Sequence, residues 1–410
     1  MHLVPGDVHL IAGIVIFIAS YVVFAFGKFP GMKIDRPGMA IIGAVLMVAV
    51  RIVTAQDALR YVDFATIVLL FSMMLVVANL RLVGFFDRVA EFLVTRLGQA
   101  HLLPAVIIST GVLSAFFVND IICLVMVPIV LQITKRMAVR PLPYLLAVAT
   151  ASNIGSVATI TGNPQNILIG AYSGISYRSF LAHLGPVAAI GLFVDWAVLH
   201  WMFRSNMHTH AASLEPGVVV RRNGGLLKPG VVVAGVIAGF LIGFPPALVA
   251  AVGAAIILIT RSMEPRLVYD EVDWGLLVFF VGLFVIVGGA EKVGIVASML
   301  DVAQTWNLHN TVIFSIVTAV MSNLVSNVPA VMLLKSVVPQ FPDPHRAWLL
   351  LAMASTLAGN LTITGSIANI IVVERARQEV HIGFWDYARV GVPVTILTLF
   401  IGTMWLWLVN

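Results

Sequence analysis

The sequence predicts an all-α polytopic membrane protein made of two inverted repeats, each with five transmembrane helices and one re-entrant hairpin. Three observations predict this. First, the 410 residues are 60% hydrophobic and only 10% charged, whereas soluble domains carry about 25% charged residues. Second, short motifs recur in the same order in both halves. Third, basic residues gather in alternate loops. Because a soluble fold of this size could not bury so much apolar surface, lipid is the expected solvent.

Ten apolar segments are predicted to cross the bilayer. They are close to the roughly 20 residues that a helix needs for this. The first lacks the basic stretch of a signal peptide, so we expect it to be retained. Polar interruptions make the fourth and ninth segments predicted broken helices. The segments lie near residues 8–27, 37–55, 62–80, 141–173, 184–203, 227–244, 247–262, 272–290, 346–373 and 384–408.

Two further segments, 103–134 and 309–338, are predicted to be re-entrant hairpins. Each has two short apolar stretches with an asparagine between them, Asn119 and Asn327 respectively. Neither stretch is long enough to span alone. A non-helical tip at membrane depth is tolerated only where it is buried in protein or faces water. One long, ordinary helix with a polar interruption is the alternative for each segment.

Three motifs recur along the chain with a slowly drifting offset. Their recurrence in one order predicts a first repeat over 1–203, a cytoplasmic linker over 204–226 and a second repeat over 227–410. The matched pairs are Val62-Asp63-Phe64 with Val272-Asp273-Trp274, the stretch 114–119 with 322–327, and the stretch 159–166 with 362–369, at offsets of 210, 208 and 203.

The predicted topology is inverted between the halves. A hairpin does not change sides and five spans are an odd number, so the second repeat must start from the opposite face. With both termini outside the cell membrane, 18 of the 24 Lys and Arg residues fall in cytoplasmic loops, as the positive-inside rule requires. The net charge of +5 is therefore explained by topology, and no nucleic-acid partner is predicted.

Four polar clusters in matching positions are the candidate substrate or ion site. In the first broken helix, Gly162-Asn163-Pro164 removes a backbone donor and interrupts the helix. Freed carbonyls can coordinate a cation, and the N–H groups of the next half-helix can face an anion. The alternative is a set of kinked helices whose polar side chains bond to neighbours. The candidates are Asn119, Asp120, Thr161, Gly162, Asn163 and Asn166 in the first repeat, and Ser326, Asn327, Thr364, Gly365, Ser366 and Asn369 in the second.

Asp120 is the predicted proton-coupling residue. It is the only carboxylate at either hairpin tip, and Val328 occupies the matching position. An acid at that depth suggests a function, although an acid bonded to nearby backbone N–H groups is the structural alternative. A second acid in an apolar run, Asp195, has no matching polar cluster, so we favour a structural or interfacial role for it. The single cysteine, Cys123, is a poor arsenic site and reads as a small buried hydrophobe.

The residues resemble the ion-transporter superfamily over nearly the whole chain. The resemblance rests on the Asn119-Asp120 tip followed by Val127-Pro128-Ile129-Val130, and on the loop 161–166. That group includes arsenite permeases, NhaD-type sodium–proton antiporters, silicon efflux carriers and dicarboxylate/sulfate carriers. The tips differ from the Ser-Asn-Thr of the dicarboxylate carriers, and the Asn-Asp tip looks closest to the arsenite-permease branch.

The resemblance implies a scaffold and a moving transport domain, an elevator motion and a homodimer. An arsenite permease would also have a cytoplasmic ATPase partner. The resulting prediction is proton-coupled efflux of a small inorganic oxyacid or oxyanion, such as arsenite or antimonite. A sodium–proton antiporter and a sodium-coupled anion or dicarboxylate carrier are the alternatives. A passive channel is disfavoured by paired hairpins that close on one site. No nucleophile, metal-ligand or cofactor pattern predicts an enzyme, and the only accessory ion expected is a coupling H⁺ or Na⁺.

Overall fold

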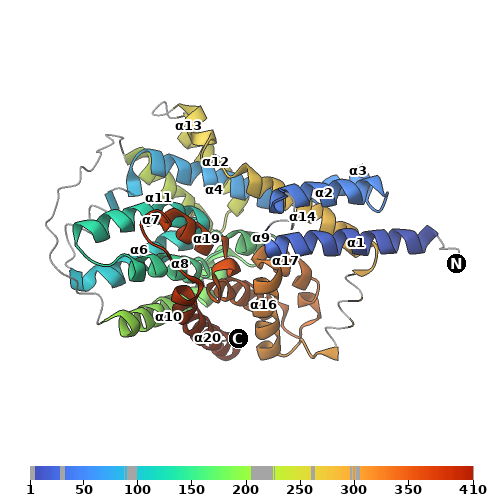
Figure 1. Ribbon diagram of the computed structural model, residues 1–410. Coiled ribbons are helices and arrows are strands. Elements are labelled where there is room, and N and C mark those ends of the chain that lie inside the picture. Colours follow the sequence, from blue (N-terminus) through green and yellow to red (C-terminus); the bar gives the residue numbers. More distant parts are fainter. Residues whose placement is uncertain are drawn as a thin grey trace.

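The computed structural model describes residues 5–27, 33–86, 88–89, 99–204, 225, 227–259, 264–295, 298, 301 and 305–409. Throughout these ranges the elements are helices (Figure 1). The first half contains α1 (Pro5–Phe26), α2 (Arg36–Ala49), α3 (Ala55–Tyr61), α4 (Phe64–Leu82), α6 (Gln99–Phe116), α7 (Asn119–Arg136), α8 (Leu142–Ser156), α9 (Pro164–Ser173) and α10 (Tyr177–Phe203). The second contains α11 (Leu227–Ile242), α12 (Pro246–Ile259), α13 (Pro265–Tyr269), α14 (Trp274–Lys292), α16 (Thr311–Val325), α17 (Asn327–Leu334), η1 (Val338–Gln340), α18 (Pro344–Leu357), η2 (Ala358–Asn360), η3 (Ile363–Gly365), α19 (Ile367–Ala376) and α20 (Phe384–Val409).

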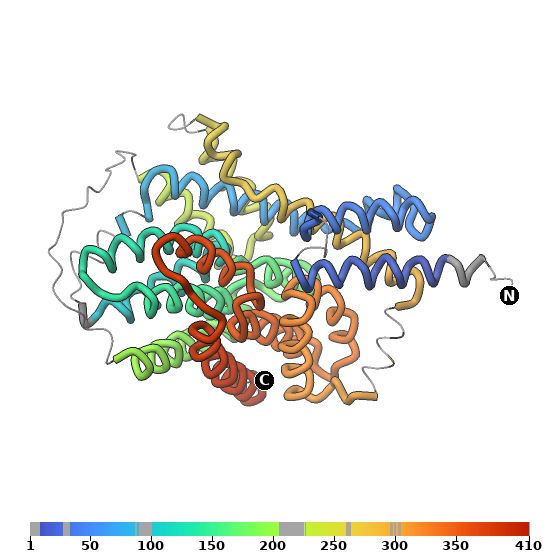
Figure 2. Tube along the Cα trace, viewed as in Figure 1, coloured from blue at the N-terminus to red at the C-terminus, as the bar shows by residue number. Residues whose placement is uncertain are grey.

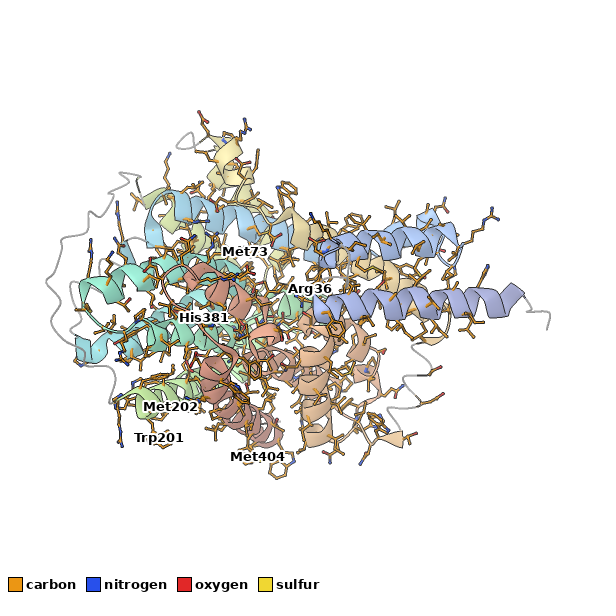
Figure 3. All side chains as sticks on the ribbon, viewed as in Figure 1. Arg36, Met73, Trp201, Met202, His381 and Met404 are labelled. Carbon is orange, nitrogen blue, oxygen red and sulfur yellow. The ribbon has the colours of Figure 1, made fainter. Side chains whose placement is uncertain are left out.

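Five of the described helices, α1, α4, α10, α14 and α20, are long and apolar enough to cross a membrane. Their outer faces carry large exposed apolar side chains, such as Phe193 (63% exposed) and Phe400 (64%), which suits contact with lipid. Trp201, at the rim of the molecule in Figure 3, is another. The chain is therefore a multi-pass membrane protein.

Two predicted spans have different bounds in the structure. The span expected at 184–203 begins earlier, at Tyr177, because Ser176 caps the helix by accepting a hydrogen bond from the Ser179 N–H (3.2 Å). The span expected at 37–55 is the shorter α2. It ends at a turn in which Arg51 has a positive φ of 59°, a conformation that a helix cannot continue.

Both predicted hairpin segments form two helices joined by a very short tip. Phe117 and Val118 separate α6 from α7, and Ser326 alone separates α16 from α17. Both predicted broken helices are interrupted, between α8 and α9 and between α18 and α19. The tube in Figure 2 follows the chain through these reversals and breaks. The interruptions leave backbone groups inside the molecule without partners in their own helix.

Local structure corresponds between the two halves at the repeated motifs. Asp63 caps α4 by accepting from the Thr66 N–H (2.8 Å), and Asp273 caps α14 by accepting from the Leu276 N–H (2.9 Å). Each of these helices ends at a glycine with positive φ, Gly84 and Gly294, as is usual after a helix C-terminus. The shared motifs thus produce the same start and stop signals in both halves.

The helices form two groups, which Figure 1 shows along opposite flanks. In one group, α2 packs against α1 and α14, and α12 packs against α4. In the other, α8 packs against α6, α7 and α10, and α16 packs against α18. The cavity described next lies where the groups meet.

Candidate transport site

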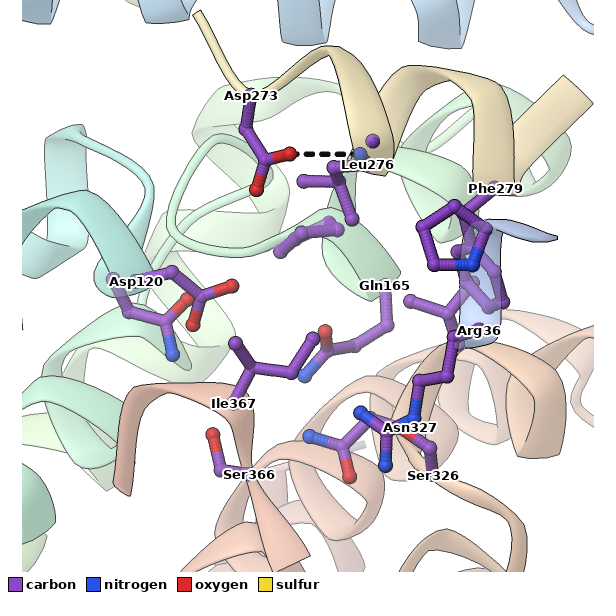
Figure 4. Close-up of a pocket in the computed structure, with 15 residues that line it drawn as sticks. Arg36, Asp120, Gln165, Asp273, Leu276, Phe279, Ser326, Asn327, Ser366 and Ile367 are labelled. Carbon is purple, nitrogen blue, oxygen red and sulfur yellow. Dashed lines mark hydrogen bonds between the residues drawn. The ribbon is translucent and has the colours of Figure 1, made fainter. Parts of the chain in front are cut away.

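A cavity of about 210 Å³ is lined by residues from both hairpin tips and both broken helices. Of the helices that the structure describes, six begin at its wall: α2, α7, α9, α14, α17 and α19. Every described lining residue except Phe279 lies in the first turn or at the N-cap of one of them. Figure 4 shows this arrangement around Gln165 and Ile367. The chain therefore directs helix N-termini, with their unpaired N–H groups, at a single space.

The helix ends give the cavity a positive backbone potential, because each N-terminus carries roughly half a positive charge. Among the six, α2, α9 and α14 are capped by the side chains of Asp35, Asn163 and Asp273. The other three, α7, α17 and α19, have no side-chain cap in the described part of the chain. The Asn119 N–H of α7 donates to the Gly162 carbonyl, so the ends of α17 and α19 are better placed to serve a bound solute, as at other anion-binding helix ends.

The tip of the first hairpin is held against the first broken helix. The Asn119 backbone N–H donates to the Gly162 carbonyl (3.0 Å). Its side-chain Nδ2 donates to Asn153 Oδ1 (3.0 Å). The Asn119 Oδ1 is buried and has no hydrogen-bond partner among the described residues. The side chain is thus fixed in orientation with one acceptor unused.

Asn153 of α8 joins the two halves at the centre of the site. Its Nδ2 donates to Asn360 Oδ1 (2.8 Å) and to Asn369 Oδ1 (3.0 Å). Its Oδ1 accepts from Asn119 Nδ2 and from the Ser366 hydroxyl, both at 3.0 Å. All four capacities of a buried amide are therefore satisfied.

The tip of the second hairpin has a strained backbone. Ser326 has φ 77° and ψ 156°, a region populated almost only by glycine. The next residue, Asn327, lines the cavity. In the amide orientation that gives both the Asn327 oxygen and nitrogen a partner, the nitrogen donates to the Ser355 and Gly365 carbonyls, both at 3.2 Å. The Asn327 oxygen then accepts from Gln165 Nε2 (3.3 Å), so this tip is fixed to both broken helices.

Two asparagines at corresponding positions of the two halves donate hydrogen bonds to backbone carbonyls at the helix breaks. Asn166 Nδ2 donates to carbonyls 10 and 7 residues earlier, those of Ser156 and Thr159 (both 3.0 Å). Asn369 Nδ2 donates at the same two spacings, to Gly359 (2.7 Å) and Thr362 (3.0 Å). Carbonyls freed by the breaks are thus satisfied within the protein.

The predicted site residues divide into wall and support. The wall contains Asn119, Asp120, Ser326, Asn327 and Ser366. The supporting residues lie off the wall: Gly162, Asn163, Asn166, Gly365 and Asn369. Two threonines point elsewhere, since the Thr161 hydroxyl is 2.9 Å from the Tyr177 hydroxyl and Thr364 is exposed.

Three charged side chains face the cavity. The Asp120 carboxyl lies within reach of the Ala368 backbone N–H at the start of α19 and is close to Arg36 and Asp273. Arg36 Nε donates to the Phe24 carbonyl (2.9 Å). Asp120 is therefore both a partner of a helix N-terminus and the carboxylate closest to the polar tip.

Several polar residues of the site do not stand out in the sequence. Arg36 is one of many basic residues in predicted loops, and Asp273 belongs to a repeated motif outside the polar clusters. Gln165 belongs to the conspicuous Gly-Asn-Pro-Gln motif, which could have pointed to it. Asn153 directly follows Ala151-Ser152, a pair that recurs as Ala354-Ser355 in the second half, and this recurrence could have pointed to it.

The other two singled-out residues lie away from the cavity wall. Asp195 is fully buried, and its Oδ2 is 3.0 Å from the Thr150 hydroxyl. Cys123 is also buried, with its Sγ 3.1 Å from the Ser152 hydroxyl. Neither lines the cavity, in keeping with the roles assigned to them from the sequence.

Comparison with known proteins identifies the family. A family model described as CitMHS, citrate transporter, matches residues 21–358. The chain belongs to the CitMHS family. Silicon efflux transporter LSI3 of Oryza sativa subsp. japonica is 30% identical, with 92% of this chain and 93% of that protein aligned. Putative transporter arsB of Dictyostelium discoideum is 25% identical, over 90% of this chain and 87% of that protein.

The CitMHS chain also shares its fold with a solved transporter. The YdaH transporter of Alcanivorax borkumensis aligns with a TM-score of 0.56 at 13% identity, over 98% of this chain and 97% of the other. The resemblance to the ion-transporter superfamily is thereby confirmed, and the chain is a membrane transporter of the CitMHS family.

Proposed function

We propose that this transporter exports a small oxyacid or oxyanion, such as arsenite or antimonite, in exchange for protons. The observation that carries the proposal is the cavity where two hairpin tips and six helix N-termini meet, with the Asp120 carboxyl at the first tip and the Asp273 carboxyl at the start of α14. Neutral amides and N–H groups can bind a small solute, while a carboxyl can take up and release a proton.

The size and polarity of the cavity favour a small hydroxylated solute. Its volume of about 210 Å³ is below the roughly 300–1,000 Å³ typical of pockets for drug-sized ligands. Amide groups of Asn119, Gln165 and Asn327 lie on its wall. Relatives whose names mention silicon efflux and arsB agree with an oxyacid cargo.

Proton coupling is assigned to Asp120 because its charge faces groups of both signs. Arg36, Asp273 and the Ala368 N–H all lie around this carboxyl. A solute that changes these contacts changes the proton affinity of Asp120, which is the thermodynamic requirement for coupling.

We further propose an elevator-type movement of the helix group containing the hairpins against the group containing α2 and α14. In the predicted topology α2 and α14 both start at the cytoplasmic side, so the cavity beside Arg36 and Asp273 would face the cytoplasm. The proposal includes the homodimer expected of such carriers, placement in the inner membrane with both termini outside, and an ATPase partner if the chain works as an arsenite permease.

A sodium-coupled carboxylate carrier is the second candidate. The citrate-transporter family model supports it, and so does Arg36 on the cavity wall, because a guanidinium pairs well with a carboxylate. This candidate predicts transport driven by a sodium gradient instead of a pH gradient.

The test is transport into proteoliposomes. Purified protein would be assayed with arsenite, antimonite, silicic acid and citrate, with a pH gradient, a sodium gradient or neither. We expect arsenite movement driven by the pH gradient. Asp120→Asn should reach the membrane and lose this gradient-driven transport, while exchange at equal pH survives because it needs no net proton movement.

Asp195→Asn is the matched control, since it also neutralises a buried acid but lies off the cavity wall. It should retain gradient-driven transport. Normal gradient-driven transport by Asp120→Asn would remove the coupling role, and citrate uptake driven only by sodium would replace the proposal with the second candidate.

A further inference from the structure

Arg36 reaches the cavity with part of its guanidinium uncommitted. Its Nε donates to the Phe24 carbonyl of α1 (2.9 Å), which fixes the direction of the side chain. Its terminal Nη groups have no hydrogen-bond or ion-pair partner among the described residues. A guanidinium offers paired N–H donors in a rigid fork that matches two oxygens of one solute.

Arg36 and Asp120 enter the cavity from opposite sides in Figure 4. They are close enough to influence each other electrostatically. No ion pair within 4 Å joins them in the described part of the chain. The cavity thus separates a cation from a carboxylate and leaves room between them for a solute.

The side of the cavity that carries Asp120 also holds an unused acceptor. Asn119 Oδ1 is buried and unpartnered among the described residues, although its own Nδ2 is fixed by Asn153. A buried acceptor without a partner is destabilising, so a donor supplied by the solute would be favoured. Arg36 therefore presents donors to the cavity, and Asn119 and Asp120 present acceptors across from it, while the Asp273 carboxylate is a further acceptor on the wall.

We infer that Arg36 binds an oxygen of the cargo while Asn119 Oδ1 accepts a hydrogen bond from one of its hydroxyl groups. The site then selects oxyacids that retain hydroxyl groups over anions that have none. This inference rests on the proposed function and assigns its binding groups.

The second half offers no equivalent of Arg36. The corresponding helix, α12, follows Pro245 and starts at Pro246. A second cavity of about 380 Å³ lies beside this helix. Three of its lining residues, Ala65, Thr66 and Leu69, match three lining residues of the first cavity, Gly275, Leu276 and Phe279, at the repeat offset of 210. None of its described lining residues is charged. A basic residue is therefore not required to start this helix, and beyond its bond to the Phe24 carbonyl the Arg36 guanidinium remains available to a ligand.

The test measures arsenite counterflow in proteoliposomes at equal pH, with silicic acid or sulfate as competitor. Wild-type protein should be inhibited by silicic acid, which carries hydroxyl groups, and not by sulfate, which is fully deprotonated. Arg36→Gln should weaken the apparent affinity for arsenite at least about tenfold, the size expected for loss of a charged hydrogen bond. Arg36→Lys should be intermediate, and Arg60→Gln, at an exposed position on α3, should match wild type.

A second measurement uses the unmodified protein and needs no variant to fold. Phenylglyoxal modification of arginines is followed by mass spectrometry with and without arsenite or silicic acid. Solute at a concentration well above its dissociation constant occupies nearly all sites and shields the bound group. It should therefore slow modification of Arg36 at least about fivefold and leave the modification of Arg60 unchanged.

The outcomes separate this inference from the proposed function. Absence of arsenite counterflow in wild type removes the proposed function itself. Three other results leave the proposed function in place but overturn the assignment of Arg36 and Asn119. They are counterflow without protection of Arg36 by solute, unchanged affinity in a folded Arg36→Gln, and competition by sulfate as strong as that by silicic acid.

Discussion

Replacing Asn153 by alanine should loosen the connection between the two halves. The substitution removes four hydrogen bonds, of 2.8 to 3.0 Å, to Asn119, Asn360, Ser366 and Asn369. Hydrogen bonds between membrane helices are worth about 0.6 kcal/mol each, and those in soluble proteins about 1 kcal/mol. The expected loss is therefore about 2–4 kcal/mol, a large part of a typical folding free energy. Asn119 would lose its one side-chain hydrogen bond among the described residues, so solute affinity should fall as well.

The assay is thermal unfolding of purified protein in detergent, followed by intrinsic fluorescence, together with arsenite counterflow. Thr110→Val is the matched control, because Thr110 is equally buried but its hydroxyl has no hydrogen-bond partner among the described residues. Asn153→Ala should unfold several degrees lower and lose counterflow, whereas Thr110→Val should unfold at or above the wild-type temperature. An unfolding temperature for Asn153→Ala equal to that of the control would show that the network contributes no stability.

Three further predictions concern backbone strain, pH and topology. Ser326→Gly should stabilise the protein by about 1 kcal/mol by relieving the positive φ, whereas Val118→Gly at the matching tip, where φ is −56°, should destabilise it; equal effects on the unfolding temperature would argue against strain. A hydrogen bond from a lysine lowers the pKa of Asp57 below its usual 3.8. The ionised carboxylate therefore adds to the free energy of unfolding above that pH, and this stabilisation is lost as the pH falls through the lowered pKa. Asp57→Asn should flatten the dependence of stability on pH below about pH 4, and an unchanged dependence there would contradict this. Single cysteines in the loops 135–140 and 335–346 should react with an impermeant thiol reagent from opposite sides of the membrane, and labelling from one side would exclude the inverted topology.

The residues that face the cavity were partly visible in the sequence. Asn119, Asp120 and Asn327 stand out because a polar residue inside an apolar segment must be satisfied by protein or water. Ser366 was found through its place in a repeated motif. Thr161 and Thr364 belong to the same motifs, yet the first contacts Tyr177 and the second is exposed. Motif membership indicates the region of a broken helix but does not give the direction of each side chain.

Composition, motif recurrence and loop charges by themselves determined the helical membrane class, the hairpin segments and the helix breaks, because each depends on local chemistry: apolar length, backbone donors and the cost of polar groups in lipid. Only the tertiary structure decided that Arg36 and Asp273 lie beside the hairpin tips, and that Asn153 contacts partners 207 and 216 residues away. An arginine ahead of a helix reads as a loop charge until the packing of α2 against α14 places it at the cavity. Such contacts depend on how helices distant in sequence are arranged, and no local pattern carries that information.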